Sequence, residues 1–162
     1  MLDINFIRNV EQSSPAELFA ICARFADALI GVKLFTLTSI HPQEGLARRI
    51  YSNMPQVYPV SGTKPMTESP WSEQVLKRGE IFVANDIESI AQVFPDHALI
   101  ASLGCASVIN IPIIFAKEVI GTVNCLHETA FYTPDRVALA AALKSAGLIC
   151  FLAHRLQSKN LA

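Results

Sequence analysis

The stretch Cys105–His127, CASVINIPIIFAKEVIGTVNCLH, decides the fold. Two runs with strand-like composition, Cys105–Phe115 and Glu118–His127, are separated only by Ala116 and Lys117. Runs rich in β-branched and aromatic residues favour β-strands. A two-residue connection between two strands is long enough only for a tight antiparallel hairpin. The sequence therefore predicts an antiparallel sheet that contains this hairpin.

The length of the turn also predicts the register of the hairpin. Phe115 is expected opposite Glu118, and Ser107 opposite Leu126, so that alternate side chains share one face of the sheet. One face should then carry Cys105, Ser107, Ile109, Ile111, Thr122, Asn124 and Leu126. The other face should carry Ala106, Val108, Asn110, Val123, Cys125 and His127. Because the first set is richer in polar groups, we expect it to face a ligand cavity; a slip of one residue would reverse the assignment.

Three helices are predicted where a Ser or Thr precedes a Pro, because such a pair combines a capping side chain with a helical φ. These pairs are Ser14-Pro15, Ser69-Pro70 and Thr133-Pro134. The first pair also belongs to a capping box, Ser14 to Glu17, and the second begins a short helix closed by Gly79. Further strands are expected at Val32–Ile40, Ala47–Asn53 and Ile81–Ala84, and a further helix at Pro95–Leu103.

This order of elements predicts one α+β domain with an antiparallel sheet. The expected domain covers residues 1–162, with an N-terminal extension (1–13), a first helix (14–31), the sheet and lid (32–128) and a C-terminal helix (133–158). The terminal helices should cover one face of the sheet. The segment from Tyr58 to Leu103 should form a lid of loops and short helices on the other face, where a ligand cavity is expected.

Composition excludes several function classes. The chain has 162 residues and a formal net charge of -1, with scattered basic residues, so we expect no nucleic-acid partner. The N-terminus shows no basic region before a long apolar run, which favours a cytoplasmic location. The only long apolar tract, Val137–Ala153, contains Lys144 and Ser145 and is short for a bilayer, so no membrane partner is expected.

The cysteines and histidines do not form a recognised chemical motif. Cys22, Cys105, Cys125 and Cys150 contain no CxxC pair, which favours reduced, buried thiols over a disulfide framework. Cys125 and His127 share a predicted sheet face, but His41, His97 and His154 are not spaced to complete a zinc site. A cysteine nucleophile also needs a base and an orienting group. We therefore assign no metal site and no catalytic residue.

The C-terminal helix predicts an oligomer. Phe151 falls seven residues after Lys144 and four before Arg155, on the most polar side of the helix, while Leu148 and Leu156 point elsewhere. A helix that is apolar almost all round is expected to be buried on more than one side. We therefore expect a homodimer packed through the terminal helices, with a third helix of the same chain as the alternative cover.

The stretch from Ser102 to Arg136, SLGCASVINIPIIFAKEVIGTVNCLHETAFYTPDR, preceded by WSEQVLKRGEIFVAND from Trp71 to Asp86, resembles GAF domains, ligand-binding modules related to PAS domains. The resemblance implies a six-stranded antiparallel sheet, terminal helices behind it and a small-molecule pocket in front, often in dimeric sensors. Bilin-binding members carry a thiol where this chain has Val93–His97, so the resemblance does not imply covalent attachment of a chromophore. The signature of cyclic-nucleotide-binding members is also missing.

The favoured function is a non-catalytic sensor that binds a small molecule of unknown identity and signals through dimer geometry or a partner protein; no cofactor is identified. The expected lining residues are Phe35, Tyr51, Trp71, Phe94, His97, Cys105, Ser107 and Asn124. One alternative is a structural dimerisation module whose cavity is filled by Phe94 and Met66. The other, implied by the resemblance, is a thiol-dependent reductase of the free methionine-R-sulfoxide reductase type, with Cys105 as nucleophile.

Overall fold

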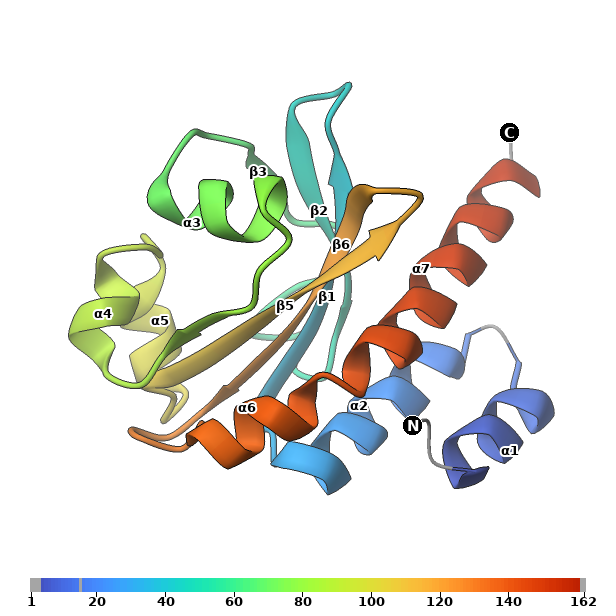
Figure 1. Ribbon diagram of the computed structural model, residues 1–162, viewed down its shortest axis with the longest axis horizontal. Helices are drawn as coiled ribbons and strands as arrows, with labels where there is room; N and C mark the ends of the chain where they lie inside the picture. The colour runs from blue at the N-terminus through green and yellow to red at the C-terminus, as the bar shows by residue number, and fades with distance from the viewer. Residues whose placement is uncertain (1–3, 15, 161–162) are drawn as a thin grey trace.

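A six-stranded antiparallel sheet with the strand order β3-β2-β1-β6-β5-β4 forms the centre of the fold (Figure 1). The computed structural model describes residues 4–14 and 16–160. The strands are β1 (Leu34–His41), β2 (Leu46–Ser52), β3 (Thr63–Pro65), β4 (Phe82–Ala84), β5 (Ser107–Phe115) and β6 (Glu118–His127). The predicted α+β fold with an antiparallel sheet is confirmed. The short edge strand β3 was not expected at its position.

The β5–β6 hairpin turns at Ala116 and Lys117, as predicted. Both residues have positive φ angles, 51° and 70°. This left-handed backbone matches the twist of a two-residue hairpin and is usually adopted by Asn or Gly. Phe115 lies opposite Glu118, in agreement with the expected pairing at the turn.

The terminal helices cover one face of the sheet (Figure 1). They are α1 (Ile4–Gln12), α2 (Leu18–Ile30), α6 (Pro134–Ala140) and α7 (Leu143–Asn160). The larger hydrophobic core lies between these helices and the strands. The segment predicted as an N-terminal extension contains a helix, α1. The ring centroid of its Phe6 lies 4.9 Å from that of Phe25 in α2.

Both predicted terminal helices differ from the observed ones at their ends. Helix α2 begins at Leu18, and Ser14 donates from its backbone N–H and its hydroxyl to the carboxylate of Glu17, at 2.9 and 2.7 Å. Pro15, the expected first helical residue, lies outside the described residues. The C-terminal helix is divided into α6 and α7, which are bent by 40° at the break. Within residues 4–14 and 16–160 no single helix is long and apolar enough to cross a bilayer. Helices α6 and α7 meet that length and composition only when they are counted together as one bent segment.

The lid lies on the other face of the sheet (Figure 1). It contains α3 (Pro70–Ser72), which continues into a π-helical turn (Glu73–Lys77), α4 (Ile87–Ala91) and α5 (His97–Ser102). As predicted, Ser69 caps α3: its side chain accepts the backbone N–H of Ser72, while the Ser72 hydroxyl accepts that of Ser69. A second, smaller hydrophobic cluster lies under the lid and includes Tyr58, Ile90 and Ile100.

The predicted register of β5 against β6 is wrong beyond the turn. Ile113 pairs with Gly121 and Ile114 with Val119, so Ile120 is an extra residue that forms a β-bulge. Ser107 consequently lies opposite His127, not opposite Leu126. In a bulge, two residues of one strand oppose one residue of its partner. Every β5 residue from Ile113 back to Ser107 therefore has a partner one position further along β6 than a regular hairpin would give.

The bulge reverses the expected faces of β5 but not those of β6. Thr122, Asn124 and Leu126 face the lid, as expected, and Cys125 faces the helices. On β5, however, Val108 and Asn110 face the lid, whereas Ile109 and Ile111 belong to the core under the helices.

A second bulge lies between β1 and β2. Leu37 pairs with Tyr51 and Thr38 with Arg49, which leaves Ile50 as the extra residue. As a result, Ile50 and Tyr51 both pack toward the helices, while Arg49 faces the lid.

Candidate functional site

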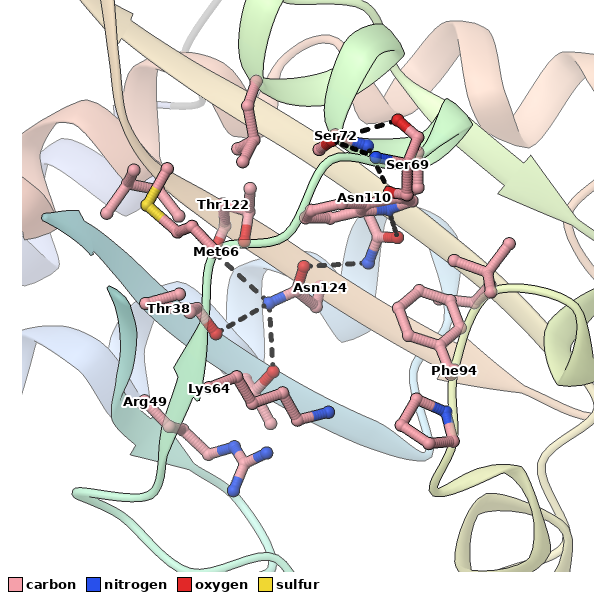
Figure 2. Close-up of a pocket in the computed structure, with 18 of the residues that line it drawn as sticks. Thr38, Arg49, Lys64, Met66, Ser69, Ser72, Phe94, Asn110, Thr122 and Asn124 are labelled. Atoms are coloured by element: carbon pink, nitrogen blue, oxygen red, sulfur yellow. Dashed lines mark hydrogen bonds between the residues drawn. The ribbon is translucent and has the colours of Figure 1, made fainter. Parts of the chain in front are cut away.

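A pocket of about 480 Å³ lies between the sheet and the lid. Its floor consists of lid-facing residues of β1, β2, β5 and β6, and its other walls come from Tyr58 and from residues within 62–76 and 93–100. A volume of this size is typical of sites for small molecules. Figure 2 shows that the labelled polar side chains of the floor point into the space under the lid.

A continuous row of hydrogen bonds crosses the floor (Figure 2). Trp71 Nε1–H donates to Asn110 Oδ1 at 2.9 Å, and Asn110 Nδ2 donates to Asn124 Oδ1 at 2.8 Å. Asn124 Nδ2 then donates to the hydroxyl oxygens of Thr36 and Thr38, both at 3.2 Å. Because an indole nitrogen can only donate, Trp71 fixes the orientation of both amide groups. The row is therefore polarised in one direction, from the lid to β1.

The row has a consequence for binding, because it leaves hydrogen-bond donors unused. The hydroxyls of Thr36 and Thr38 accept from Asn124, so their own protons are free to be donated, and no acceptor for them lies among the described residues. Asn110 Nδ2 has two hydrogens, and only one is used by Asn124. The floor can therefore donate hydrogen bonds to acceptor groups of a bound molecule.

Aromatic and aliphatic groups make up much of the remaining wall. The rings of Trp71 and Phe94 meet edge to face with centroids 6.3 Å apart. Phe94 also contacts Phe82, which lies outside the pocket lining, with centroids 6.2 Å apart. Other apolar groups at the pocket are Ile40, Met66, Leu76, Ile100, Val108 and Leu126. This wall can bury the apolar part of a ligand.

A charged cluster lies at one side of the pocket. The Arg49 guanidinium lies over the ring of Tyr58 at 3.9 Å, and the Tyr58 hydroxyl donates to Asp96. Lys64 Nζ lies 3.3 Å from the same carboxylate oxygen, Asp96 Oδ2. These contacts connect the β2–β3 region to the start of α5 and so hold the lid against the sheet.

Burial and pairing have opposite effects on the acid of this cluster. Burial alone would raise the pKa of Asp96, but the Tyr58 hydrogen bond and the Lys64 charge outweigh it and lower the pKa below its usual value. Burial raises the pKa of Tyr58, and its hydrogen bond to Asp96 adds to the effect. Burial lowers the pKa of Arg49, although an arginine remains charged at neutral pH. The cluster therefore contains two cations and one anion.

Three of the eight residues expected from the sequence line the pocket: Trp71, Phe94 and Asn124. Cys105 is buried under the lid in the smaller hydrophobic cluster and does not reach the pocket. His97 lies at the start of α5, with Nδ1 3.1 Å from the carbonyl oxygen of Phe94. Trp71, Phe94 and Asn124 thus lie where a ligand could contact them, and their role in ligand binding stays a prediction.

Phe35, Tyr51 and Ser107 do not line the pocket either, so the expectation of a lining position was wrong for five residues: these three, Cys105 and His97. Phe35 and Tyr51 pack against the core under the helices. Ser107 is fully buried and donates to the carbonyl oxygen of Glu128 at 2.7 Å. The predicted alternation placed Ser107 on one face with Asn124, and the bulge at Ile120 separates them. In a regular strand Tyr51 would likewise share a face with Arg49, but the bulge at Ile50 separates these two.

Sequence reasoning missed several polar residues at the pocket: Thr36, Thr38, Arg49, Lys64 and Asn110. A polar amide within the apolar run Val108–Phe115 was a usable signal, because a buried Asn needs partners. The alternation Thr36-x-Thr38 was a second one. The contributions of Arg49 and Lys64 depend on how β2 and β3 pair, which the sequence did not indicate.

Metal-binding clusters and pocket-lining thiols are not found among the residues that the structure describes. No group of three His, Cys, Asp or Glu side chains among residues 4–14 and 16–160 is arranged to hold a metal ion. The four cysteines are buried and free, and burial raises the pKa of the Cys105 thiol.

Comparisons with known proteins agree with this geometry. Residues 12–146 match the family model described as GAF domain. The GAF domain of an Acinetobacter phosphoenolpyruvate-protein phosphotransferase is 14% identical, with a TM-score of 0.72 and coverage of 95% of this chain and 93% of that one. The GAF domain of a Bacillus halodurans two-component sensor histidine kinase is 14% identical, with a TM-score of 0.68 and coverage of 90% and 98%.

A phycoerythrobilin-bound GAF domain from a cyanobacterial phytochrome is also similar, at 14% identity, a TM-score of 0.68 and coverage of 95% of this chain and 94% of that one. At these identities the solved structures establish the fold alone. A search among curated proteins gives no match.

Proposed function

The chain belongs to the GAF domain family, and from this membership and the pocket we propose that it is a sensor module that binds a small molecule between sheet and lid. The single observation that carries the proposal is the 480 Å³ pocket whose polar floor has unused donors. Binding, without chemical conversion, is the function that this arrangement supports best.

The pocket favours a sensor over a structural module with a filled cavity. That alternative requires Phe94 and Met66 to occupy the space under the lid. Both side chains instead line the pocket and leave its volume open. A structural module also gains nothing from polar groups with unused donors, because such groups cost stability when they are buried without partners.

The ligand is proposed to bind without a covalent bond. The phycoerythrobilin-bound relative shows that a domain of this fold can hold a ligand. In this chain, no cysteine lines the pocket within the described residues. The reductase alternative meets the same difficulty, because Cys105 lies outside the pocket and its raised pKa disfavours the reactive thiolate.

Native mass spectrometry of freshly purified protein tests the proposal directly, since it detects a co-purifying small molecule. A thermal-shift screen of metabolites is the second test: a ligand at about a hundred times its dissociation constant should add about 2.7 kcal/mol to the stability of the native state. Met66→Trp is the negative control for binding: the larger side chain fills part of the pocket and should abolish the ligand-induced rise in melting temperature. No co-purifying molecule, together with no response from a broad library, would refute the proposal.

Signalling is proposed to use a homodimer packed through the terminal helices. The structure changes the residues expected there, because Phe151 is covered by the sheet: it is 1% exposed and lies against Gly121. Ile4 of α1 and Leu156 of α7 are instead 65% and 66% exposed, which supports a partner on this side. Light scattering at micromolar concentration should give a dimer for the parent chain and a monomer for Leu156→Glu; a monomeric parent would exclude the proposal.

A further inference from the structure

We infer that the pocket selects an amphipathic molecule with a singly charged carboxylate, whose anionic group lies at Arg49 and Lys64 and whose apolar body lies against Trp71 and Phe94. The inference rests on the proposed function and adds the chemical class of the ligand. It comes from the distribution of charge and of unused hydrogen-bond donors around the pocket.

The charged side chains that line the pocket are both cations. Among the described residues, its lining contains Arg49 and Lys64 and no Asp or Glu. They share one face of adjacent strands: Lys64 of β3 lies opposite Ala47, two residues before Arg49 on β2. Figure 2 shows both side chains on the same side of the pocket, across from Phe94. The positive charge is therefore concentrated at one end.

The charge count favours a single negative charge on the ligand. Asp96 is not one of the lining residues, but it pairs with Lys64 and so offsets one of the two cations. One positive charge remains uncompensated next to a partly buried space. A cationic group or a dianion on the ligand would leave net charge in the site, and unpaired charge in a partly desolvated site is unfavourable.

The guanidinium of Arg49 has donors without acceptors. Its Nη1 donates to the carbonyl oxygen of Pro59 at 2.8 Å. Its Nε is buried and unpartnered, and no acceptor for Nη2 lies among the described residues. Nη2 is therefore the donor that can reach an anionic group in the pocket, and a charge-assisted hydrogen bond from a guanidinium to a carboxylate is stronger than a neutral one. Lys64, at half exposure, can add a second charged contact at the rim.

The floor and the wall complete the selection. The free hydroxyl protons of Thr36 and Thr38 and the second amide hydrogen of Asn110 can donate to further acceptor atoms of the ligand. On the opposite side, Trp71 and Phe94 form an edge-to-face aromatic pair that can bury a ring or an aliphatic chain. A cationic ligand would meet no Asp or Glu among the described residues that line the pocket.

Three probes with one naphthyl body separate the contribution of the head group. They are 1-naphthylacetate, its uncharged amide 1-naphthylacetamide, and 1-naphthyl phosphate. Isothermal titration calorimetry should give a dissociation constant for the carboxylate at least about tenfold lower than for the amide, because hydrogen bonds to charged groups are the stronger kind. The phosphate should bind no more tightly than the carboxylate.

Substitutions assign this preference to the two cations. Lys64 is on the exposed edge strand β3, and Arg49 is on β2. Lys64→Gln and Arg49→Gln should each reduce the preference for the carboxylate over the amide to about threefold or less. Arg49→Lys keeps the charge and should keep part of the preference. The matched control is Lys144→Gln, which removes an equal charge from the exposed surface of α7, on the opposite side of the sheet, and should leave all three affinities unchanged. Circular dichroism and the melting temperature show whether each variant is folded, and Lys64→Gln decides the test if Arg49→Gln is not.

Each outcome separates the inference from the proposed function. Equal binding of carboxylate and amide would overturn the inference but leave a small-molecule pocket. Tighter binding of the phosphate would show a site for a dianion and would also overturn it. If none of the three probes binds, the inference is overturned, while the sensor proposal is still decided by the mass spectrometry and the thermal-shift screen.

Discussion

Replacing Gly121 with alanine should destabilise the protein, because helix α7 approaches β6 at a position where only a hydrogen fits. A Cβ added at Gly121 would lie 2.3, 2.4 and 2.7 Å from three ring atoms of Phe151. Carbon atoms in contact normally lie about 3.5–4.0 Å apart. Since the Phe151 ring is 1% exposed and is covered on all sides, it cannot move into solvent to relieve the clash.

The expected loss of stability follows from two opposing effects. Overpacking of a core typically costs about 1–3 kcal/mol, and three close contacts on a stiff ring place this site near the upper end. Alanine in place of glycine recovers about 1 kcal/mol by restricting the unfolded chain. The net destabilisation should be about 2 kcal/mol. For a domain of this length, this corresponds to a decrease of about 4–8 °C in melting temperature.

Urea denaturation and thermal melting followed by circular dichroism measure this loss. Phe151→Leu should lower stability by itself but should also relieve the clash, so the double variant should be more stable than the two single effects predict. Gly45→Ala is the control, because a Cβ there meets nothing within 4 Å and its backbone strain should add independently to Phe151→Leu. If Gly121→Ala is as stable as the parent, or if Phe151→Leu gives no relief, the described contact between α7 and β6 is wrong.

Three further predictions concern the polar groups. Asn124→Leu should cost about 2 kcal/mol in urea denaturation because it leaves the donors and acceptors of the floor unpaired; an unchanged midpoint would contradict the row of hydrogen bonds. Asp96→Asn should be less stable than the parent above the unfolded pKa of about 3.9, and the difference should vanish as pH falls through the lowered folded pKa; a constant difference in pH-dependent melts would argue against the pairing. Burial lowers the pKa of His127, whose Nδ1 accepts the Glu128 N–H at 2.9 Å, so protonation should oppose folding. The parent should therefore lose stability as pH falls below about 6.5, and His127→Phe should reduce that slope; an unchanged slope would refute this.

Local sequence determined five of the six strands and the family of this protein. The two-residue connection at Ala116 and Lys117 permits only a hairpin, and Ser69 before Pro70 places a cap at the start of α3. These features depend on residues that are close in the chain, so their physical basis can be recognised without a tertiary structure. For the same reason, strands β1, β2, β4, β5 and β6 were predicted to within two residues at each end.

Tertiary structure decided which side chains form the pocket. The bulges at Ile50 and Ile120 each add one residue to one strand, which moves Tyr51 away from the face of Arg49 and brings Asn110 to the pocket in place of Ser107. A bulge puts two residues of one strand opposite one residue of its partner, so the side chains beyond it change faces although the composition of the strand stays the same. The charged end of the pocket likewise consists of residues from β2, β3 and the start of α5, which are distant in the chain and lie together only because the lid packs against the sheet. Periodicity gives the alternation of a regular strand, but contacts between residues distant in the chain determine where that alternation is interrupted.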